Sequence, residues 1–138
     1  MSGALLLDTC ACLWIMKDEW LKPEAVDALD EAHDRGDRIY VSPITAWEVG
    51  NLARKRRFKS SHSPQRWLEL LLARPQIAVA QMPPHLLLDS CWLPGDLHAD
   101  PADRIIAATA REYGFTLMTR DRGLLEYGRE GYLSVLEC

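Results

Sequence analysis

The stretch ALLLDTCACLWIM, which spans residues 4–16, decides the fold. Residues 4–7 form a short, continuously apolar run, which is typical of a strand buried on both faces of a parallel sheet. From Thr9 to Met16 the apolar side chains recur at helical spacing, so we expect a helix there. Asp8 stands between the two elements. A buried strand that leads directly into a helix indicates an α/β fold.

The same alternation continues along the rest of the chain. Helices are expected to begin at or near Pro23, Pro43, Pro64, Pro84 and Pro101, because proline is favoured in the first turn of a helix. Short β-rich runs lie at residues 39–41, 77–79, 115–118 and 133–136. Short strands that alternate with helices predict a largely parallel sheet flanked by helices.

The length and composition are those of an ordinary globular protein. The chain has 138 residues, of which 48% are hydrophobic and 26% are charged, so we expect one domain over residues 1–138. No apolar run approaches the roughly 20 residues of a membrane-spanning helix, and no secretory signal is visible. The four cysteines lack the spacing of zinc ligands. We therefore expect a reduced, cytoplasmic protein that does not enter a membrane and whose cysteines mostly fill the core.

The charge is unevenly distributed. A net charge of −4 by itself disfavours binding to nucleic acid. Between Val49 and Leu68, however, there is no acidic residue, and the basic residues are Arg54, Lys55, Arg56, Arg57, Lys59 and Arg66. An acidic protein can bind phosphates through such a local patch, although a run of charges alone is more often a solvated helix face.

Several carboxylates stand where the predicted strands end. Asp8 directly follows the first strand, and Asp121 lies just past the strand that ends at Thr119. If these strands are parallel neighbours, both side chains lie at one edge of the sheet, which is where folds of this type place their sites. Three further acids lie on predicted helices: Asp100 and Asp103 open the helix at Pro101, and Glu48 lies on the helix that begins at Pro43.

Each of these acids allows two interpretations. Asp8, Asp100 and Asp121 can simply cap the helices that follow them. The helix dipole favours Asp103 in a first turn, and Glu48 can be an ordinary exposed helix residue. Together in one cleft, however, the acids would repel one another unless a divalent cation neutralised them. Oxygen ligands suit Mg²⁺ or Mn²⁺ rather than zinc, and the coincidence at one sheet edge favours such a metal site.

Four stretches of the chain resemble, in the same order, the motifs of PIN-domain proteins. They are LLDTCACLW at 6–14, SPITAWEV at 42–49, DPADRIIAATA at 100–110 and LMTRD at 117–121. The resemblance spans residues 4–136, and together with the chain length it is greatest to VapC-type toxins of bacterial toxin–antitoxin pairs. It implies a three-layer PIN-like fold with a central, largely parallel sheet of four to five short strands.

The resemblance also implies roles for individual residues. The family's acidic quartet falls on Asp8, Glu48, Asp103 and Asp121. Asp100 is then either a helix cap or an additional metal contact, and Thr119 matches a small hydroxyl residue that lines the site. The implied activity is that of a Mg²⁺-dependent endoribonuclease, with Mn²⁺ as an alternative ion, that leaves a 5′-phosphate and a 3′-hydroxyl. The implied partners are RNA, a VapB-type antitoxin and a second copy of the chain.

The basic run keeps two candidate roles. The side chains of residues 54–57 can hold RNA phosphates beside the acidic quartet, or they can dock an acidic antitoxin tail. We interpret Trp47, Trp67 and Trp92 as core or interface anchors rather than as platforms for stacking bases. We expect an apolar groove for the antitoxin near Trp47 and Trp67.

Two other classes of function remain as alternatives. The first is a non-catalytic PIN-like module that binds RNA or an antitoxin without cleaving. Retention of four mutually repelling acids favours an enzyme over this module. The second is a structure-specific DNA nuclease on the same fold, which is disfavoured because the chain has no large additional helical arch.

Overall fold

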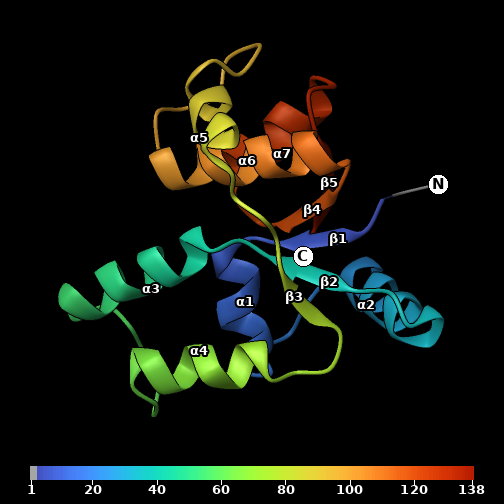
Figure 1. Ribbon diagram of the computed structural model, residues 1–138. Coiled ribbons are helices and arrows are strands. Elements are labelled where there is room, and N and C mark those ends of the chain that lie inside the picture. Colours follow the sequence, from blue (N-terminus) through green and yellow to red (C-terminus); the bar gives the residue numbers. More distant parts are fainter. Residues whose placement is uncertain (1–2) are drawn as a thin grey trace.

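A five-stranded parallel sheet forms the centre of the protein. The computed structural model describes residues 3–138. The strands are β1 (Leu5–Leu7), β2 (Ile39–Val41), β3 (Ile77–Val79), β4 (Thr116–Thr119) and β5 (Ser134–Glu137). They are arranged in the order β3-β2-β1-β4-β5, and every neighbouring pair is parallel (Figure 1). The α/β fold with a parallel sheet is therefore confirmed.

The helices begin and end close to the predicted positions. They are α1 (Thr9–Met16), α2 (Pro23–Arg35), α3 (Ile44–Arg54), α4 (Pro64–Leu72), α5 (Pro84–Cys91), α6 (Pro101–Tyr113) and α7 (Arg122–Arg129). Gly36 and Gly114 end α2 and α6 in the left-handed conformation, with φ of 69° and 68°. Along residues 3–138, no helix has both the length and the apolar character needed to cross a membrane.

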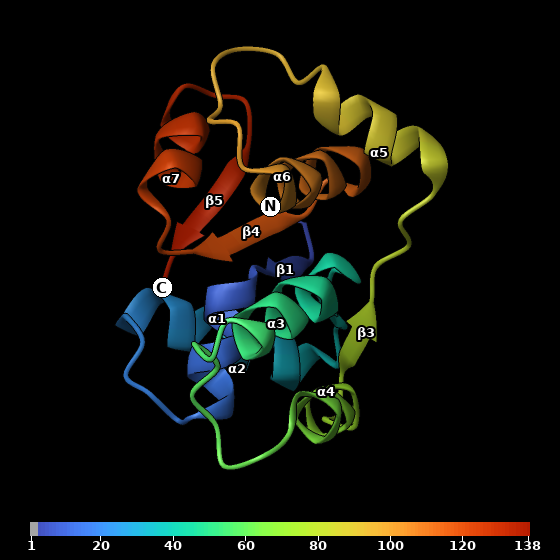
Figure 2. The same cartoon turned by 90° about the vertical axis from the view of Figure 1, so that its left-hand side faces the viewer.

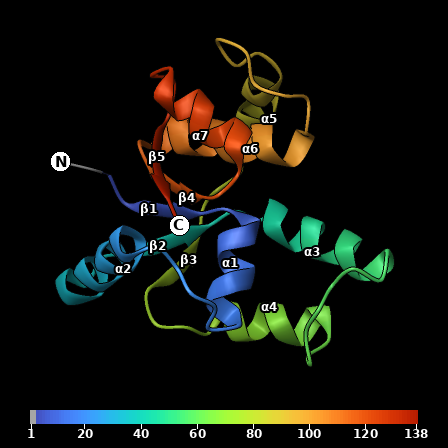
Figure 3. The same ribbon diagram turned by 180° about the vertical axis from the view of Figure 1, so that it is seen from behind.

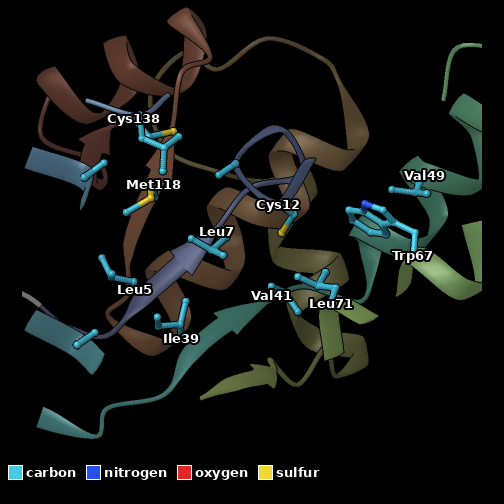
Figure 4. Close-up of a cluster of buried hydrophobic side chains, with 14 residues drawn as sticks. Leu5, Leu7, Cys12, Ile39, Val41, Val49, Trp67, Leu71, Met118 and Cys138 are labelled. Carbon is cyan, nitrogen blue, oxygen red and sulfur yellow. The ribbon is translucent and has the colours of Figure 1, made fainter. Parts of the chain in front are cut away.

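Alternating side chains of the central strand divide the core into two clusters. Leu5 and Leu7 point to one face of the sheet, where residues of α1, α2, α3 and α4 complete a cluster (Figure 4). Leu6 points to the other face and packs against α6 and α7. All three leucines are buried. The sheet is thus the middle layer of three, as Figures 1 and 3 show from opposite sides.

The order of the strands determines where a site can form. From β1 the chain moves outward through β2 to β3, and it then crosses to the other side of β1 to form β4 and β5. The connections from β1 and β4 therefore leave in different directions, and at such a point open parallel sheets form their ligand-binding crevice, outside the carboxyl ends of the strands. Helix α3 extends beyond this edge of the sheet (Figure 1). Figure 2 shows the molecule from the side on which α3 lies in Figure 1.

The three tryptophans singled out in the sequence have different environments. Trp67 is 3% exposed and lies in the core, edge-on to Phe58. Trp47 and Trp92 are 58% and 82% exposed, so a core role is wrong for both. Trp47 is two residues from the buried Thr45 of α3, and two residues turn the side chain about 200° around a helix. Trp92 directly follows the end of α5.

The cysteines match the sequence prediction only in part. All four are free thiols, but only Cys12 and Cys138 are buried. Cys10 and Cys91 are exposed. Half of the cysteines therefore fill the core, fewer than expected.

Candidate active site

The predicted acidic quartet converges on the crevice at the carboxyl ends of β1 and β4. Four different elements supply its members, which are Asp8 after β1, Glu48 in α3, Asp103 in the first turn of α6 and Asp121 after β4. The pKa of the nearby Cys10 thiol is affected by all four carboxylates, which shows that they lie close together. This pKa is raised to about 12, first by desolvation and then by the negative charge of all four carboxylates. We refer to these four residues as the acidic site.

Asp8 is the most deeply buried member of the acidic site. Its side chain is held by two donors, the backbone N–H of Ala11 at 2.7 Å and the hydroxyl of Thr119 at 2.5 Å. Burial raises the pKa of Asp8, these two hydrogen bonds oppose the rise, and the nearby charge of Asp121 adds to it. Asp8 therefore does cap α1, and the same hydrogen bonds fix the orientation of its carboxylate.

Thr119 joins the ends of the two central strands. Its hydroxyl donates to Asp8 and accepts the backbone N–H of Asp121 at 3.0 Å. The residue has no exposed surface. The structure thus places the predicted hydroxyl residue between the carboxylate of Asp8 and the backbone of Asp121.

Glu48 reaches the acidic site from α3. The residue is half-buried, so it is not an ordinary exposed helix residue. Thr9 donates a hydroxyl hydrogen bond to its carboxylate, and Thr45 lies 3.0 Å from the Thr9 hydroxyl. Burial raises the pKa of Glu48, as do the charges of Asp100 and Asp8, whereas the bond from Thr9 lowers it. Sequence reasoning missed the role of Thr9, although its place directly after Asp8 is a usable signal.

The carboxylate of Asp103 has a strongly raised pKa. Its pKa is raised to about 7, first by burial and then by the charges of Asp100, Asp121 and Glu48, and only His98 opposes the rise. Asp100 itself is exposed. It caps α6 by accepting the backbone N–H groups of residues 102 and 103. Asp100 is therefore a helix cap beside the acidic site, and a direct metal contact stays a prediction.

His98 is a second residue of this site that sequence reasoning missed. It lies in the segment between α5 and α6, with Nε2 at 3.3 Å from Oδ2 of Asp103 and 3.4 Å from Oδ2 of Asp121. Asp121 also accepts the backbone N–H of Leu124 at 2.9 Å and so caps α7. The available signal was the position of His98 two residues before the cap of the acidic helix.

The donor set of the acidic site fits a divalent cation. Across residues 3–138, no lysine or arginine forms an ion pair with any of its four carboxylates. The pKa values of Asp8, Glu48 and Asp103 are all raised, so the protein alone leaves their negative charge poorly compensated. Ligand atoms of Asp103, Asp121 and His98 lie within 4.8 Å of one another. Carboxylate oxygens are hard ligands of the kind that Mg²⁺ and Mn²⁺ bind.

The basic segment, residues 54–57, begins at the last residue of α3. All four side chains are exposed, and in the part of the chain that the structure describes none of them forms an ion pair. Arg54 lies six residues after Glu48 on the same helix, a distance of about 9 Å along the axis at 1.5 Å per residue. A free basic segment thus shares its helix with one acid of the acidic site.

Comparison with known proteins identifies relatives of the whole chain. The family model of the PIN domain matches residues 5–130. The chain is 31% identical over 124 residues to Ribonuclease VapC22 of Mycobacterium tuberculosis, which covers 90% of this chain and 91% of that protein. Two solved complexes resemble the fold. DNA-bound VapBC from Salmonella typhimurium has a TM-score of 0.66 at 22% identity, covering 99% of this chain and 98% of that one. VapBC2 from Rickettsia felis bound to promoter DNA has a TM-score of 0.63 at 16% identity and covers 98% of both chains.

The length of these matches decides the family. The PIN model covers most of the chain, and its range contains all four carboxylates of the acidic site. The relative of nearly equal length is aligned over 90% of the chain. This protein belongs to the PIN-domain family.

Proposed function

We propose that this protein is a Mg²⁺-dependent endoribonuclease and the toxin of a VapBC-type toxin–antitoxin pair. The observation that carries the proposal is the acidic site, four carboxylates gathered at the carboxyl ends of β1 and β4 with no lysine or arginine paired to them within residues 3–138. The 31% identical relative is named a ribonuclease, VapC22, and the structural neighbours are VapBC complexes. These names support the assignment of substrate and system.

The carboxylates of the acidic site are the groups that would bind the ion. Asp8, Asp103, Asp121 and Glu48 would bind it, with Asp100 at the margin. Bound Mg²⁺ would lower the pKa of a coordinated water and stabilise the charge that develops on the scissile phosphodiester. Thr119 and Thr9 keep Asp8 and Glu48 in fixed orientations.

The nuclease assay separates this proposal from its alternatives. The full chain is incubated with RNA and with single-stranded DNA of matched sequence, in Mg²⁺ and in EDTA. We expect Mg²⁺-dependent cleavage of RNA that leaves 5′-phosphates, and no cleavage in EDTA. Binding to RNA without cleavage in any condition would identify a non-catalytic module. Equal cleavage of the DNA would identify a nuclease of broader substrate range.

We propose that the antitoxin binds a groove between α1, α4 and the connection from α3 to α4. This groove has a volume of about 910 Å³, and its apolar lining includes Leu13, Met16, Trp67 and Leu70. Its charged lining is mainly basic and consists of Lys17, Lys59 and Arg74, with Glu19 as the acidic member. Apolar side chains beside basic ones suit an amphipathic, acidic segment of a VapB-type antitoxin. The groove lies at Trp67 as expected, but Trp47 is not among its lining residues.

Charge reversal tests the groove as the antitoxin site. The double variant Lys59→Glu, Arg74→Glu should weaken binding of the antitoxin, and the loss should be larger at low salt because charge attraction is screened by ions. Arg38→Glu, also exposed but outside the groove, is the matched control and should bind normally. Equal affinity of the double variant and the control would place the antitoxin elsewhere.

We also propose a homodimer in the cytoplasm. The exposed apolar side chains Leu88 and Trp92 lie four positions apart at the end of α5, which puts them on one side of the molecule. The free thiols fit a reducing compartment. Sedimentation should give a dimer mass for the wild type and a monomer mass for the double variant Leu88→Ser, Trp92→Ser. A monomeric wild type would contradict the dimer.

A further inference from the structure

We infer that His98 is a positioning residue that orients Asp103 and Asp121 toward the metal and does not itself bind the ion. The inference rests on the proposed function, because it concerns the same acidic site. The imidazole comes from the segment before α6 and is placed between carboxylates of two helices, Asp103 of α6 and Asp121 at the start of α7.

The second ring nitrogen determines which atom carries the proton. The backbone N–H of Asp100 donates to Nδ1 of His98 at 3.3 Å, so the lone pair of Nδ1 is engaged. In a neutral imidazole the other nitrogen then carries the hydrogen. Nε2 therefore donates toward the carboxylates, and a nitrogen that carries a hydrogen has no lone pair for a metal.

The carboxylate oxygens show how this donor would act. Oδ2 of Asp121 faces Nε2 of His98 and also accepts the backbone N–H of Leu124. Two donors on this one oxygen leave Oδ1 for other partners. Oδ2 of Asp103 lies within 3.3 Å of the same Nε2. A single N–H between two like charges fixes their orientation and reduces their repulsion, as outer partners of metal ligands commonly do.

A glycine in α7 provides independent support. A Cβ atom on Gly123 would lie 2.4 Å from Cδ2 and 2.8 Å from Nε2 of His98, and 3.1 Å from Oδ2 of Asp121. The φ of Gly123 is not positive, so its backbone conformation does not require glycine. A Cβ at this position would therefore require the imidazole ring to move, which shows how closely His98 packs against the start of α7.

Calorimetric titration of the full chain with Mg²⁺ or Mn²⁺ alone tests the role of His98. We expect His98→Ala to weaken both ions by a similar factor of about 10–100 and His98→Gln, which keeps an N–H near the position of Nε2, to restore most of the affinity. Unchanged Mg²⁺ affinity in His98→Ala would overturn the inference. A loss confined to Mn²⁺ would also overturn it, because nitrogen ligands favour Mn²⁺ over Mg²⁺. A wild type that binds neither ion would instead refute the proposed function.

A double-mutant cycle tests the same role, and its first variant, Gly123→Ala, keeps the imidazole. Gly123→Ala should displace the ring and weaken Mg²⁺ binding in the wild type. The same change should have little effect in the His98→Ala background, because the group it displaces is already gone. Additive losses of affinity would show that Gly123 and His98 act independently and would contradict the inference. Thermal melting followed by circular dichroism verifies that each variant is folded.

Discussion

The hydroxyl of Thr119 stabilises the buried carboxylate of Asp8, which is proposed to bind the metal. Thr119 supplies one of the two hydrogen bonds to this buried carboxylate. The isosteric change Thr119→Val removes the donor, and leaving a buried acceptor unpaired costs about 1–3 kcal/mol. We expect a lower urea midpoint and weaker Mg²⁺ binding. Thr119→Ser should retain most of both properties.

Thr109 offers a matched control for this prediction. It is 1% exposed, but its hydroxyl donates only to the carbonyl of Ile105 in its own helix. Thr109→Val should therefore leave Mg²⁺ binding unchanged. If both valine variants bind Mg²⁺ as the wild type does, the hydrogen bond from Thr119 has no role in the site.

The raised pKa of Asp103 predicts an unusual pH dependence of stability. The folded metal-free protein holds this proton up to a pKa of about 7, against 3.8 for the ordinary group. Because the folded state then binds more protons than the unfolded state, stability falls as the pH rises between these values and levels off above 7. Burial and the neighbouring carboxylates also raise the pKa values of Asp8 and Glu48, which adds to the trend.

Melting curves in EDTA between pH 5 and pH 8 measure this dependence. We expect the melting temperature to be several degrees lower at pH 8 than at pH 5.5, and added Mg²⁺ to recover most of the difference. Asp103→Asn should flatten the curve because the amide does not titrate. A wild-type pH slope in Asp103→Asn would contradict the assignment of the raised pKa to this residue.

At the level of helices and strands, local sequence signals were sufficient for most boundaries. Proline opens α2, α4, α5 and α6 as predicted, and glycine ends α2 and α6. These signals work because they act within one turn of the backbone. Strands β4 and β5 begin one residue later than predicted. Helix α3 likewise begins at Ile44, one residue after the predicted start at Pro43.

The parts of the site that escaped prediction depend on tertiary structure. The quartet could be inferred because Asp8 and Asp121 follow strands and the motif order fixes the other two. The place of His98 depends on how the segment between α5 and α6 returns to the sheet edge, which no local pattern encodes. The exposure of Trp47 depends on which side of α3 faces the core, and a lone tryptophan does not decide that.

The basic segment at the end of α3 yields a prediction about salt. We propose that it holds RNA phosphates near the acidic site. Each phosphate contact to single-stranded nucleic acid adds about 0.7 to the slope of log affinity against log salt. The quadruple variant Arg54→Ser, Lys55→Ser, Arg56→Asn, Arg57→Ser should thus reduce the slope by up to about 3. Asparagine is chosen at position 56 because Arg56 has a φ of 59°.

The outcome of this titration separates the two roles of the basic segment. An unchanged slope for RNA, together with lost affinity for the antitoxin, would assign the segment to the partner. Arg38→Ser, which neutralises an exposed arginine before β2, serves as the control and should alter neither binding reaction.

For the whole molecule, the net charge of −4 averages over regions of opposite charge. The acidic site concentrates four carboxylates in one crevice, whereas the basic segment is free and exposed at the end of α3. Bound cations are often the largest local charges in such a site. A divalent ion would therefore convert the crevice from one that repels a phosphodiester into one that accepts it. Overall charge was a poor guide to function because it averages over both regions.

The central claim is that this crevice cleaves RNA through a metal held by its carboxylates. Its most direct test is the rate of RNA cleavage by the wild type, Asp8→Asn and Asp103→Asn in saturating Mg²⁺, with Asp30→Asn, an exposed carboxylate of α2, as the control. We predict that both site variants lose more than the 10–100-fold typical of outer partners of metal ligands, while Asp30→Asn retains the wild-type rate. Cleavage at the wild-type rate by Asp8→Asn and Asp103→Asn would contradict the account.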